Sequence, residues 1–211
     1  MIAKYRKWCL DTPNLPLFAR DWWLDAVCGA SNWNVVIDQN GLAIPYHQIR
    51  RWGLRRIVQP PCTQYTIVVD LSNHLSSLQD GQFPSPDVIR LISQMPAMLS
   101  LEINLPPGLG LGGVAENAPF EVKKRVTYRI PFGETKVEAG YSKNLKRNLK
   151  ASRELYQVEE SNDPELLNAL IRKSIPDAGK EYYVNSVSVE RMLKALLDRQ
   201  CGRFLIAKEP K

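Results

Sequence analysis

The chain has 211 residues, of which 44% are hydrophobic and 24% charged, and its formal net charge is +6. This composition is ordinary for a globular protein with one good core or two small domains, and it excludes disordered and collagen-like chains. The excess of positive charge is local, because residues 121–153 hold ten Lys or Arg against three Glu. A local excess indicates a site rather than a generally basic protein.

The first part of the chain predicts a short helix followed by antiparallel strands. The helix covers Asp21–Cys28 and ends at Gly29, with Trp22, Ala26 and Trp23 toward the core. Short segments in which apolar and polar residues alternate, separated by turn residues, then predict a meander of antiparallel strands. Its strands are expected at Trp33–Ile37, Leu42–Gln48, Leu54–Val58 and Tyr65–Leu71, with a turn at Gln39-Asn40-Gly41.

A second helix and two more strands complete this part. Ser85 is placed to cap a helix that Pro96 stops, and its apolar residues recur at helical spacing. Leu99, Leu101, Ile103 and Leu105 alternate with polar residues, which predicts a strand with these four leucine and isoleucine side chains on a buried face. The same alternation over Arg125–Ile130 predicts another strand.

After Pro131 the pattern becomes helical. We expect a basic helix over 141–156, a helix over Pro164–Ser174 opened by Asp163, and one over Val189–Gln200 opened by Ser188. The apolar segment Arg203–Ala207 predicts a final strand with no later strand to pair with. Two partners are open for it, the sheet of the first part or a second copy of the chain, and the second would make a homodimer.

The basic helix has two chemically distinct faces. At helical spacing, one narrow stripe of the helix is expected to be buried, and it consists of Tyr141, Leu145, Leu149, Ser152 and Tyr156. The cations share the opposite face. The cations are Lys143, Lys146, Arg147, Lys150 and Arg153. This face is either a solvated surface or a binding surface for an anion.

Other patterns favour structural roles. The glycine-rich segment Gly108–Gly113 follows an expected strand but no helix opens after it, so a flexible connection is favoured over a phosphate loop. His47 has apolar neighbours and no nearby carboxylate, which favours a structural histidine over a general base. The Pro60-Pro61 pair presents Thr63, Gln64 and Tyr65 at a defined place or simply makes a wide turn.

The cysteines and the N-terminus bear on metal binding and compartment. Cys9, Cys28, Cys62 and Cys201 show no C-x-x-C spacing, and only two histidines could join them, so no metal site is expected. Residues 1–8 lack the apolar region of a signal peptide, and no apolar run reaches the length of a membrane span. We expect a cytoplasmic protein with reduced cysteines buried as small hydrophobic residues.

An ordered series of segments resembles bacterial GNAT-type acyltransferases of the Fem-like group, relatives of the aminoacyltransferases that build peptidoglycan cross-bridges. The segments are Pro16-Leu-Phe18, Trp22–Cys28, Ile44-Pro-Tyr46, Pro60–Tyr65, Arg125–Tyr128 and Tyr141–Lys150. The resemblance implies an α/β fold with two GNAT-like domains, each a mixed, mostly antiparallel sheet flanked by helices. Residues 1–131 would form the first domain and 132–211 the helical start of an incomplete second one, as in a truncated product or a fragment.

The resemblance also implies a reaction, the transfer of an acyl or aminoacyl group to an amine. The donor would be acyl-CoA or an aminoacyl-tRNA, with no covalently bound cofactor, and the other substrate an anionic or nucleotide-linked molecule. In this family a central strand and the helix after it hold the acyl donor. In the second domain both elements would lie beyond Lys211, so the resemblance implies either an active or an inactive acyltransferase-like chain. The alternative function is a non-catalytic module that binds RNA or another polyanion through helix 141–156.

No residue is assigned as the catalytic base. The substrate-binding candidates are side chains embedded in these segments or on the basic face. They are Gln64, Tyr65, Tyr128, Lys143, Arg147 and Lys150.

Overall fold

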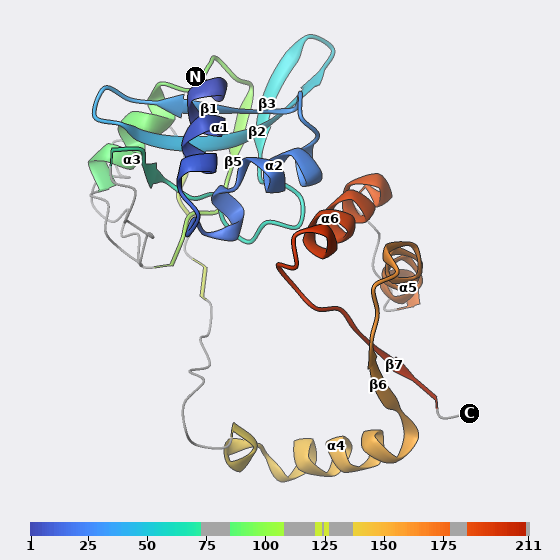
Figure 1. Cartoon of the computed structure of the whole chain (residues 1–211). Helices are drawn as coiled ribbons and strands as arrows, with labels where there is room; N and C mark the ends of the chain where they lie inside the picture. Colours follow the sequence, from blue (N-terminus) through green and yellow to red (C-terminus); the bar gives the residue numbers. More distant parts are fainter. Residues whose placement is uncertain (73–84, 108–120, 124, 127–136, 178–184, 210–211) are drawn as a thin grey trace.

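The computed structural model describes residues 1–72, 85–107, 121–123, 125–126, 137–177 and 185–209. It shows a mixed α/β protein whose main sheet is mostly antiparallel and flanked by helices (Figure 1). No helix in these ranges has the length and apolar character needed to cross a membrane.

The main sheet has the order β1-β2-β3-β5. Strands β1 (Trp33–Ile37), β2 (Leu42–Arg51) and β3 (Leu54–Val58) are antiparallel neighbours, and β5 (Ser100–Glu102) runs parallel to β3. The short strand β4 (Val69–Asp70) pairs with the start of β2. The predicted meander is therefore confirmed for β1, β2 and β3, whereas the fourth strand is shorter than expected and pairs with β2 instead of β3.

A carboxylate organises the turn between β1 and β2. Asp38 accepts hydrogen bonds from the amides of Asn40 and Leu42 at 2.9 Å and pairs with Arg90 at 2.7 Å. Gly41 follows at a φ of 86°, a conformation that suits a residue without a Cβ. The turn predicted at this point is confirmed, and it is linked to the helix that carries Arg90.

Helices cover both faces of the sheet because successive side chains of a strand point to opposite faces. Trp33 and Val35 of β1 join one buried cluster with α1 (Ile2–Asp11), η1 (Leu17–Ala19) and α2 (Asp21–Cys28). Val36 joins the other cluster, which contains the apolar stripe of α3 (Ser85–Ser93). The helices α2 and α3 were predicted, whereas α1 was not.

The prediction of a buried leucine face around β5 is partly wrong. Leu101, Ile103 and Leu105 are half-buried against the α3 cluster, but Leu99 is 65% exposed. The strand begins only at Ser100, so Leu99 precedes the paired segment. The strand predicted over Arg125–Ile130 lies mostly outside the described residues, and Val126 is 77% exposed.

Within residues 137–177 and 185–209, the chain forms three α-helices, a short 3-10 helix and a two-stranded ribbon. A 3-10 turn at Val137–Gly140 precedes α4, and the ribbon pairs β6 with β7 in antiparallel register. The elements are α4 (Lys143–Leu155), β6 (Gln157–Glu160), α5 (Pro164–Asp177), α6 (Ser186–Asp198) and β7 (Leu205–Lys208).

Two predictions for this part need correction. The final strand pairs with β6 inside the second part of the chain and not with the sheet of the first part. Every residue of β6 is exposed and three of its four are polar, so no apolar pattern revealed it. Helix α6 starts at Ser186 and is capped by Asn185, whose side chain accepts from the Val187 amide at 2.9 Å, and the predicted cap Ser188 is buried inside the helix.

Helix α6 joins this part to the first. Val189 and Leu193 pack with Leu167 and Ile206 in a third cluster, while Met192 and Leu196 also lie against the cluster that contains α2. The predicted Asp163 cap of α5 is confirmed, since its carboxylate accepts from the amides of Glu165 and Leu166 at 3.0 Å.

The cysteine prediction is half right. Cys9 and Cys28 are buried, and burial raises the pKa of each thiol to about 12, so both stay protonated at neutral pH. Cys62 and Cys201 are exposed instead. Within the described ranges, no group of three or more His, Cys, Asp or Glu side chains could hold a metal ion.

Candidate functional site

The predicted basic helix is present as α4, slightly shorter than the expected range 141–156, and its N-cap is a residue that the sequence analysis did not assign. Ser142 lies at its N-cap, and the side chain accepts a hydrogen bond from the Leu145 amide at 3.2 Å. Lys, Arg and Leu, which favour helices, fill most of the following positions. The helix ends before Tyr156, whose backbone is extended.

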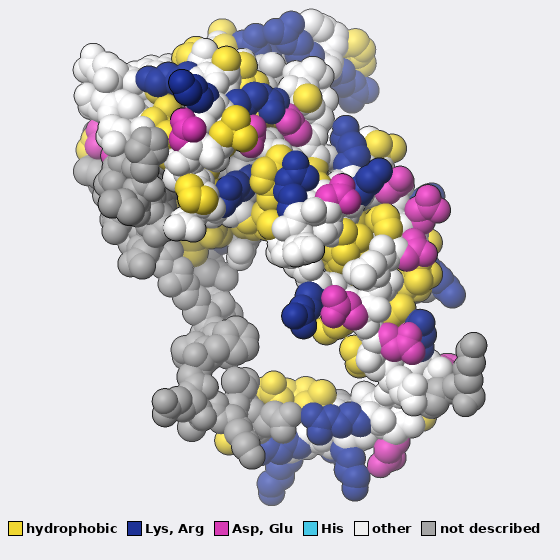
Figure 2. Space-filling model, in the orientation of Figure 1, with side chains coloured by type: hydrophobic (Ala, Val, Ile, Leu, Met, Phe, Trp, Pro, Cys, Tyr) yellow, Lys and Arg dark blue, Asp and Glu magenta, His cyan; other side chains and the backbone are white. Residues whose placement is uncertain are grey.

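The cations of α4 are exposed and lie on one side of the helix. Lys143, Lys146, Arg147 and Lys150 are all exposed, as predicted. Lys146 donates to the Ala139 carbonyl at 3.2 Å and Arg147 to the Asn144 side chain at 2.9 Å. None of the four has a carboxylate within 4.0 Å among the described residues. Figure 2 shows this row of Lys and Arg along the lower edge of the molecule.

The opposite, apolar face of α4 is not buried, which contradicts the prediction. Leu145 is 42% exposed, Leu149 is half-buried, and α4 has no buried residue. Figure 1 places α4 apart from the main sheet and its helices. The helical spacing of the leucines predicts an apolar face, but it does not specify what covers that face.

The predicted binding residues near the double proline lie at a break in the sheet. Between β3 and β4 the chain does not pair with a neighbouring strand, and the Gln59 side chain bonds to the adjacent segments instead. Its oxygen accepts from the backbone amide of Asn104 at 2.7 Å and from the Thr66 hydroxyl at 3.3 Å. The buried Trp23 indole donates to the Thr63 hydroxyl at 2.9 Å. The segment is therefore held by these side-chain hydrogen bonds together with a backbone bond from the Thr66 amide to the Asn104 carbonyl at 2.7 Å.

Gln64 and Tyr65 differ in exposure. Gln64 is exposed, and its carbonyl accepts from Asn104 at 3.4 Å, whereas Tyr65 is half-buried with its ring edge-on to Phe18 at 5.3 Å. Tyr128 lies outside the described residues. The structure does not bring Gln64 and Tyr65 to the same site as the cations of α4.

We predict that Thr63 anchors this segment. Thr63→Val keeps the shape of the side chain but leaves the buried Trp23 N–H without an acceptor, so the free energy of unfolding should fall by about 1–2 kcal/mol. Gln64→Ala, at the exposed neighbouring position, should change it by less than about 0.5 kcal/mol. Urea unfolding of both variants tests this, and equal effects would contradict the anchor.

His47 has the environment of a structural residue. Burial lowers its pKa below the usual value, and the hydrogen bond to the Gln59 carbonyl opposes this shift only in part. Its buried Nδ1 has no hydrogen-bond partner in the described part of the chain. A neutral, enclosed imidazole of this kind does not reach a substrate, which agrees with the interpretation of His47 as structural.

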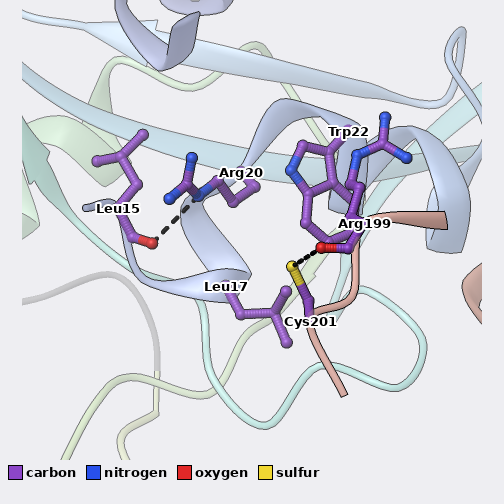
Figure 3. Close-up of a pocket in the computed structure, with 6 residues that line it drawn as sticks. All are labelled: Leu15, Leu17, Arg20, Trp22, Arg199 and Cys201. Carbon is purple, nitrogen blue, oxygen red and sulfur yellow. Dashed lines mark hydrogen bonds between the residues drawn. The ribbon is translucent and has the colours of Figure 1, made fainter. Parts of the chain in front are cut away.

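A hollow that the sequence did not indicate lies beside Trp22 (Figure 3). It has a volume of about 420 Å³ and is lined by Leu15, Leu17, Arg20, Trp22, Arg199 and Cys201. Its wall forms because the end of α6 returns onto the segment around α2, a contact between distant parts of the chain that no local pattern signals.

The cations of this hollow already have partners. The Arg199 guanidinium stacks on the Trp22 ring at 4.6 Å from its centroid. Arg20 donates to the Leu15 carbonyl at 3.1 Å and also to the Pro13 carbonyl. The Cys201 thiol donates to the Arg199 carbonyl at 3.4 Å, and none of the described lining residues is a histidine. The described lining therefore holds one thiol but no base within it to activate that thiol.

Comparison of the chain with protein-family models, with curated proteins and with solved structures finds no match in any of the three.

Proposed function

We propose that the protein is an acyltransferase-type protein of the Fem-like group, which binds an anionic substrate on the basic face of α4. The observation that carries the proposal is the set of four exposed cations without carboxylate partners in the described structure. Like charges within a helical turn repel one another, so the face gains stability when an anion lies against it.

The fold is consistent with this class. Strand β5 lies parallel to β3 and is reached through α3, while the other pairs of the sheet are antiparallel. The resemblance implies such a mixed sheet with flanking helices for the first GNAT-like domain, and it assigns the helices from residue 132 onward to the second. The donor is acyl-CoA or an aminoacyl-tRNA, both of which carry phosphates.

In the reaction that the resemblance implies, an amine attacks the carbonyl carbon of a thioester or ester, and a base removes the proton from the amine. The new C–N bond replaces the C–S bond of acyl-CoA or the C–O bond of aminoacyl-tRNA, and the thiol or hydroxyl group leaves with a proton. Backbone N–H groups that donate hydrogen bonds stabilise the negative oxygen of the tetrahedral intermediate. The cations of α4 have a different task, because they attract and orient phosphates away from the reacting carbonyl. No described residue is assigned as the base.

The second candidate function is a non-catalytic module that binds RNA or another polyanion through the same helix. It is favoured by the position of α4, whose cationic and apolar faces are both accessible in the structure (Figure 2). Phosphates along an RNA backbone match a row of cations along a helix. A homodimer through 203–207 would use the edge of β7 that does not pair with β6.

The test replaces the four cations together. Lys143→Gln, Lys146→Gln, Arg147→Gln and Lys150→Gln in one variant should abolish the rise in melting temperature that an acyl-CoA or tRNA ligand gives the unchanged protein. For RNA, the slope of log affinity against log salt should fall by about 3, since each phosphate contact contributes about 0.7.

The matched control removes the same charge elsewhere. Lys4→Gln, Lys7→Gln, Arg172→Gln and Lys173→Gln are exposed positions on α1 and α5, and this variant should bind as the unchanged protein does. Salt-dependent RNA binding without any response to acyl-CoA compounds would reject the acyltransferase in favour of the module. Equal losses in both variants would reject the α4 site.

A further inference from the structure

The hairpin between β2 and β3 exposes an unusual tip. Its sequence is Arg50-Arg51-Trp52-Gly53-Leu54-Arg55-Arg56, with two arginines on each side of an apolar turn. Trp52 and Gly53 form the turn with φ angles of 51° and 77°. Tight hairpin turns of this type favour Asn or Gly, and a bulky residue in the left-handed region is strained. Trp52 is also 85% exposed, so neither the turn nor the core explains a tryptophan there.

The charge of the hairpin is not balanced locally. Between Asp38 and Asp70 the sequence has four arginines and no acidic residue. In the strand register Arg50 lies directly opposite Arg55, a placement of like charges that destabilises a hairpin. No carboxylate lies within 4.0 Å of these arginines among the residues that the structure describes. An external anion would relieve this repulsion.

The arginines point to both faces of the ribbon. Cross-strand partners share a face and neighbours alternate, so Arg50 and Arg55 lie on one face while Arg51 and Arg56 lie on the other. Arg55 donates to the Ala97 carbonyl at 3.4 Å and Arg56 to the Ser100 hydroxyl at 3.0 Å, which ties the ribbon to β5. In Figure 2 the hairpin end carries Lys and Arg side chains at the top of the molecule.

Exposed apolar side chains lie at the same end of the sheet. Leu54 is 51% exposed, and Leu99, whose amide donates to the Arg55 carbonyl at 2.8 Å, is 65% exposed. Together with Trp52 they form an apolar tip, and the four arginines lie next to this tip on both faces of the hairpin. This hairpin tip consists of Trp52, Leu54 and Leu99 with the four arginines.

We propose that the hairpin tip binds, end-on, to the surface of a membrane that contains anionic phospholipids. Trp52, Leu54 and Leu99 enter the headgroup region, where tryptophan is favoured because one end of its ring is apolar and the other polar. The arginines behind them bind lipid phosphates, and the long arginine side chains reach the charged layer from both faces of the ribbon.

The geometry favours a membrane over a nucleic acid. A nucleic-acid strand follows a groove and contacts cations on one side of the protein surface. A membrane that the ribbon touches with its tip contacts the cations on both faces of the ribbon equally. Base stacking needs an open aromatic face, and the Arg51 guanidinium already covers one face of the Trp52 ring at 4.4 Å from its centroid. Three exposed apolar side chains at one end also match a headgroup layer better than a phosphate backbone.

The experiment measures co-sedimentation of the full chain with vesicles of phosphatidylcholine, alone or mixed with phosphatidylserine. Binding is expected only to the mixed vesicles and should weaken as salt is raised. Arg50→Gln with Arg51→Gln should weaken it about 30-fold, the effect of removing two cations from an anionic surface. Arg172→Gln with Arg191→Gln removes the same charge on α5 and α6 and should leave binding within about twofold.

Trp52→Asn separates binding from folding. Asn-Gly is a preferred sequence for this turn, so the variant should melt no lower than the unchanged protein while binding at least tenfold less to mixed vesicles. A shift of tryptophan emission to shorter wavelength on adding mixed vesicles should disappear in this variant.

Three results would overturn the proposal: equal binding to both vesicle types, equal losses in the α5–α6 control, or hairpin-dependent binding of a single-stranded RNA without binding to vesicles. The last would assign the hairpin tip to nucleic acid. The cations of α4 are unchanged in all these variants, so failure here leaves the proposed function standing.

Discussion

Asp38→Ala is expected to lower the free energy of unfolding by about 3 kcal/mol. The carboxylate is fully enclosed and accepts from the Asn40 and Leu42 amides and from Arg90, and hydrogen bonds to a charged group are each worth about 1.5–3 kcal/mol without being additive. Asp38→Asn keeps one acceptor and should cost less. Urea unfolding measures both, and a loss below about 1 kcal/mol for the alanine variant would contradict the role of Asp38.

The same residue makes stability depend on pH. Burial by itself raises the pKa of Asp38, but the hydrogen bonds from Arg90, Leu42 and Asn40 outweigh it, so the pKa lies below its ordinary value. The folded state therefore binds this proton less readily than the unfolded chain, and the stabilisation is complete above the unfolded pKa of about 4. It is lost as pH falls through the lower folded pKa. The difference between the unchanged protein and Asp38→Ala should be constant near neutral pH and should shrink below about pH 4.

Leu193→Ala is the second large effect, with an expected loss of about 3 kcal/mol. Leu193 is 1% exposed at the centre of the cluster that α6 shares with α5 and β7, and truncation leaves a cavity there. Val187→Ala on the same helix, at a position that is 56% exposed, should cost less than about 0.5 kcal/mol. Thermal unfolding compares the two variants.

Limited proteolysis adds a regional readout for Leu193→Ala. Leu193 packs with α5 and β7, whereas Met192 and Leu196 connect α6 to the cluster around α2. Loosening α6 should therefore expose the end of the chain before the main sheet unfolds. Cleavage within 186–209 should therefore accelerate, while cleavage within 33–58 should not. Equal acceleration in both regions would show that α6 and the sheet unfold as one unit.

Several elements were predictable because their signals are local. Strands Trp33–Ile37 and Leu54–Val58 have the bounds expected from alternation and turn residues, and α3 buries the apolar stripe read from its spacing. The exposure of the α4 cations was also predictable from local sequence, because charged side chains on one helix face remain in solvent without a specific packing partner.

Other features depended on contacts between distant residues. Helix α1 was missed although Tyr5, Trp8 and Cys9 share one face, and they are buried only because α2 and β1 lie against them. The partner of β7 is an exposed, mostly polar strand whose role is set by pairing. The hollow beside Trp22 likewise forms only where the chain after α6 meets the segment around α2.

The sequence by itself determined the period of each strongly patterned element, the turn at Asp38–Gly41 and the charge of α4, because backbone geometry and side-chain spacing act over a few residues. The tertiary structure alone decided which apolar faces are covered. Leu145 and Leu99 carry the same hydrophobic signal as the buried Leu91, yet they stay exposed, since burial requires a second surface at the right place. That surface comes from residues far along the chain, and no local pattern encodes their position.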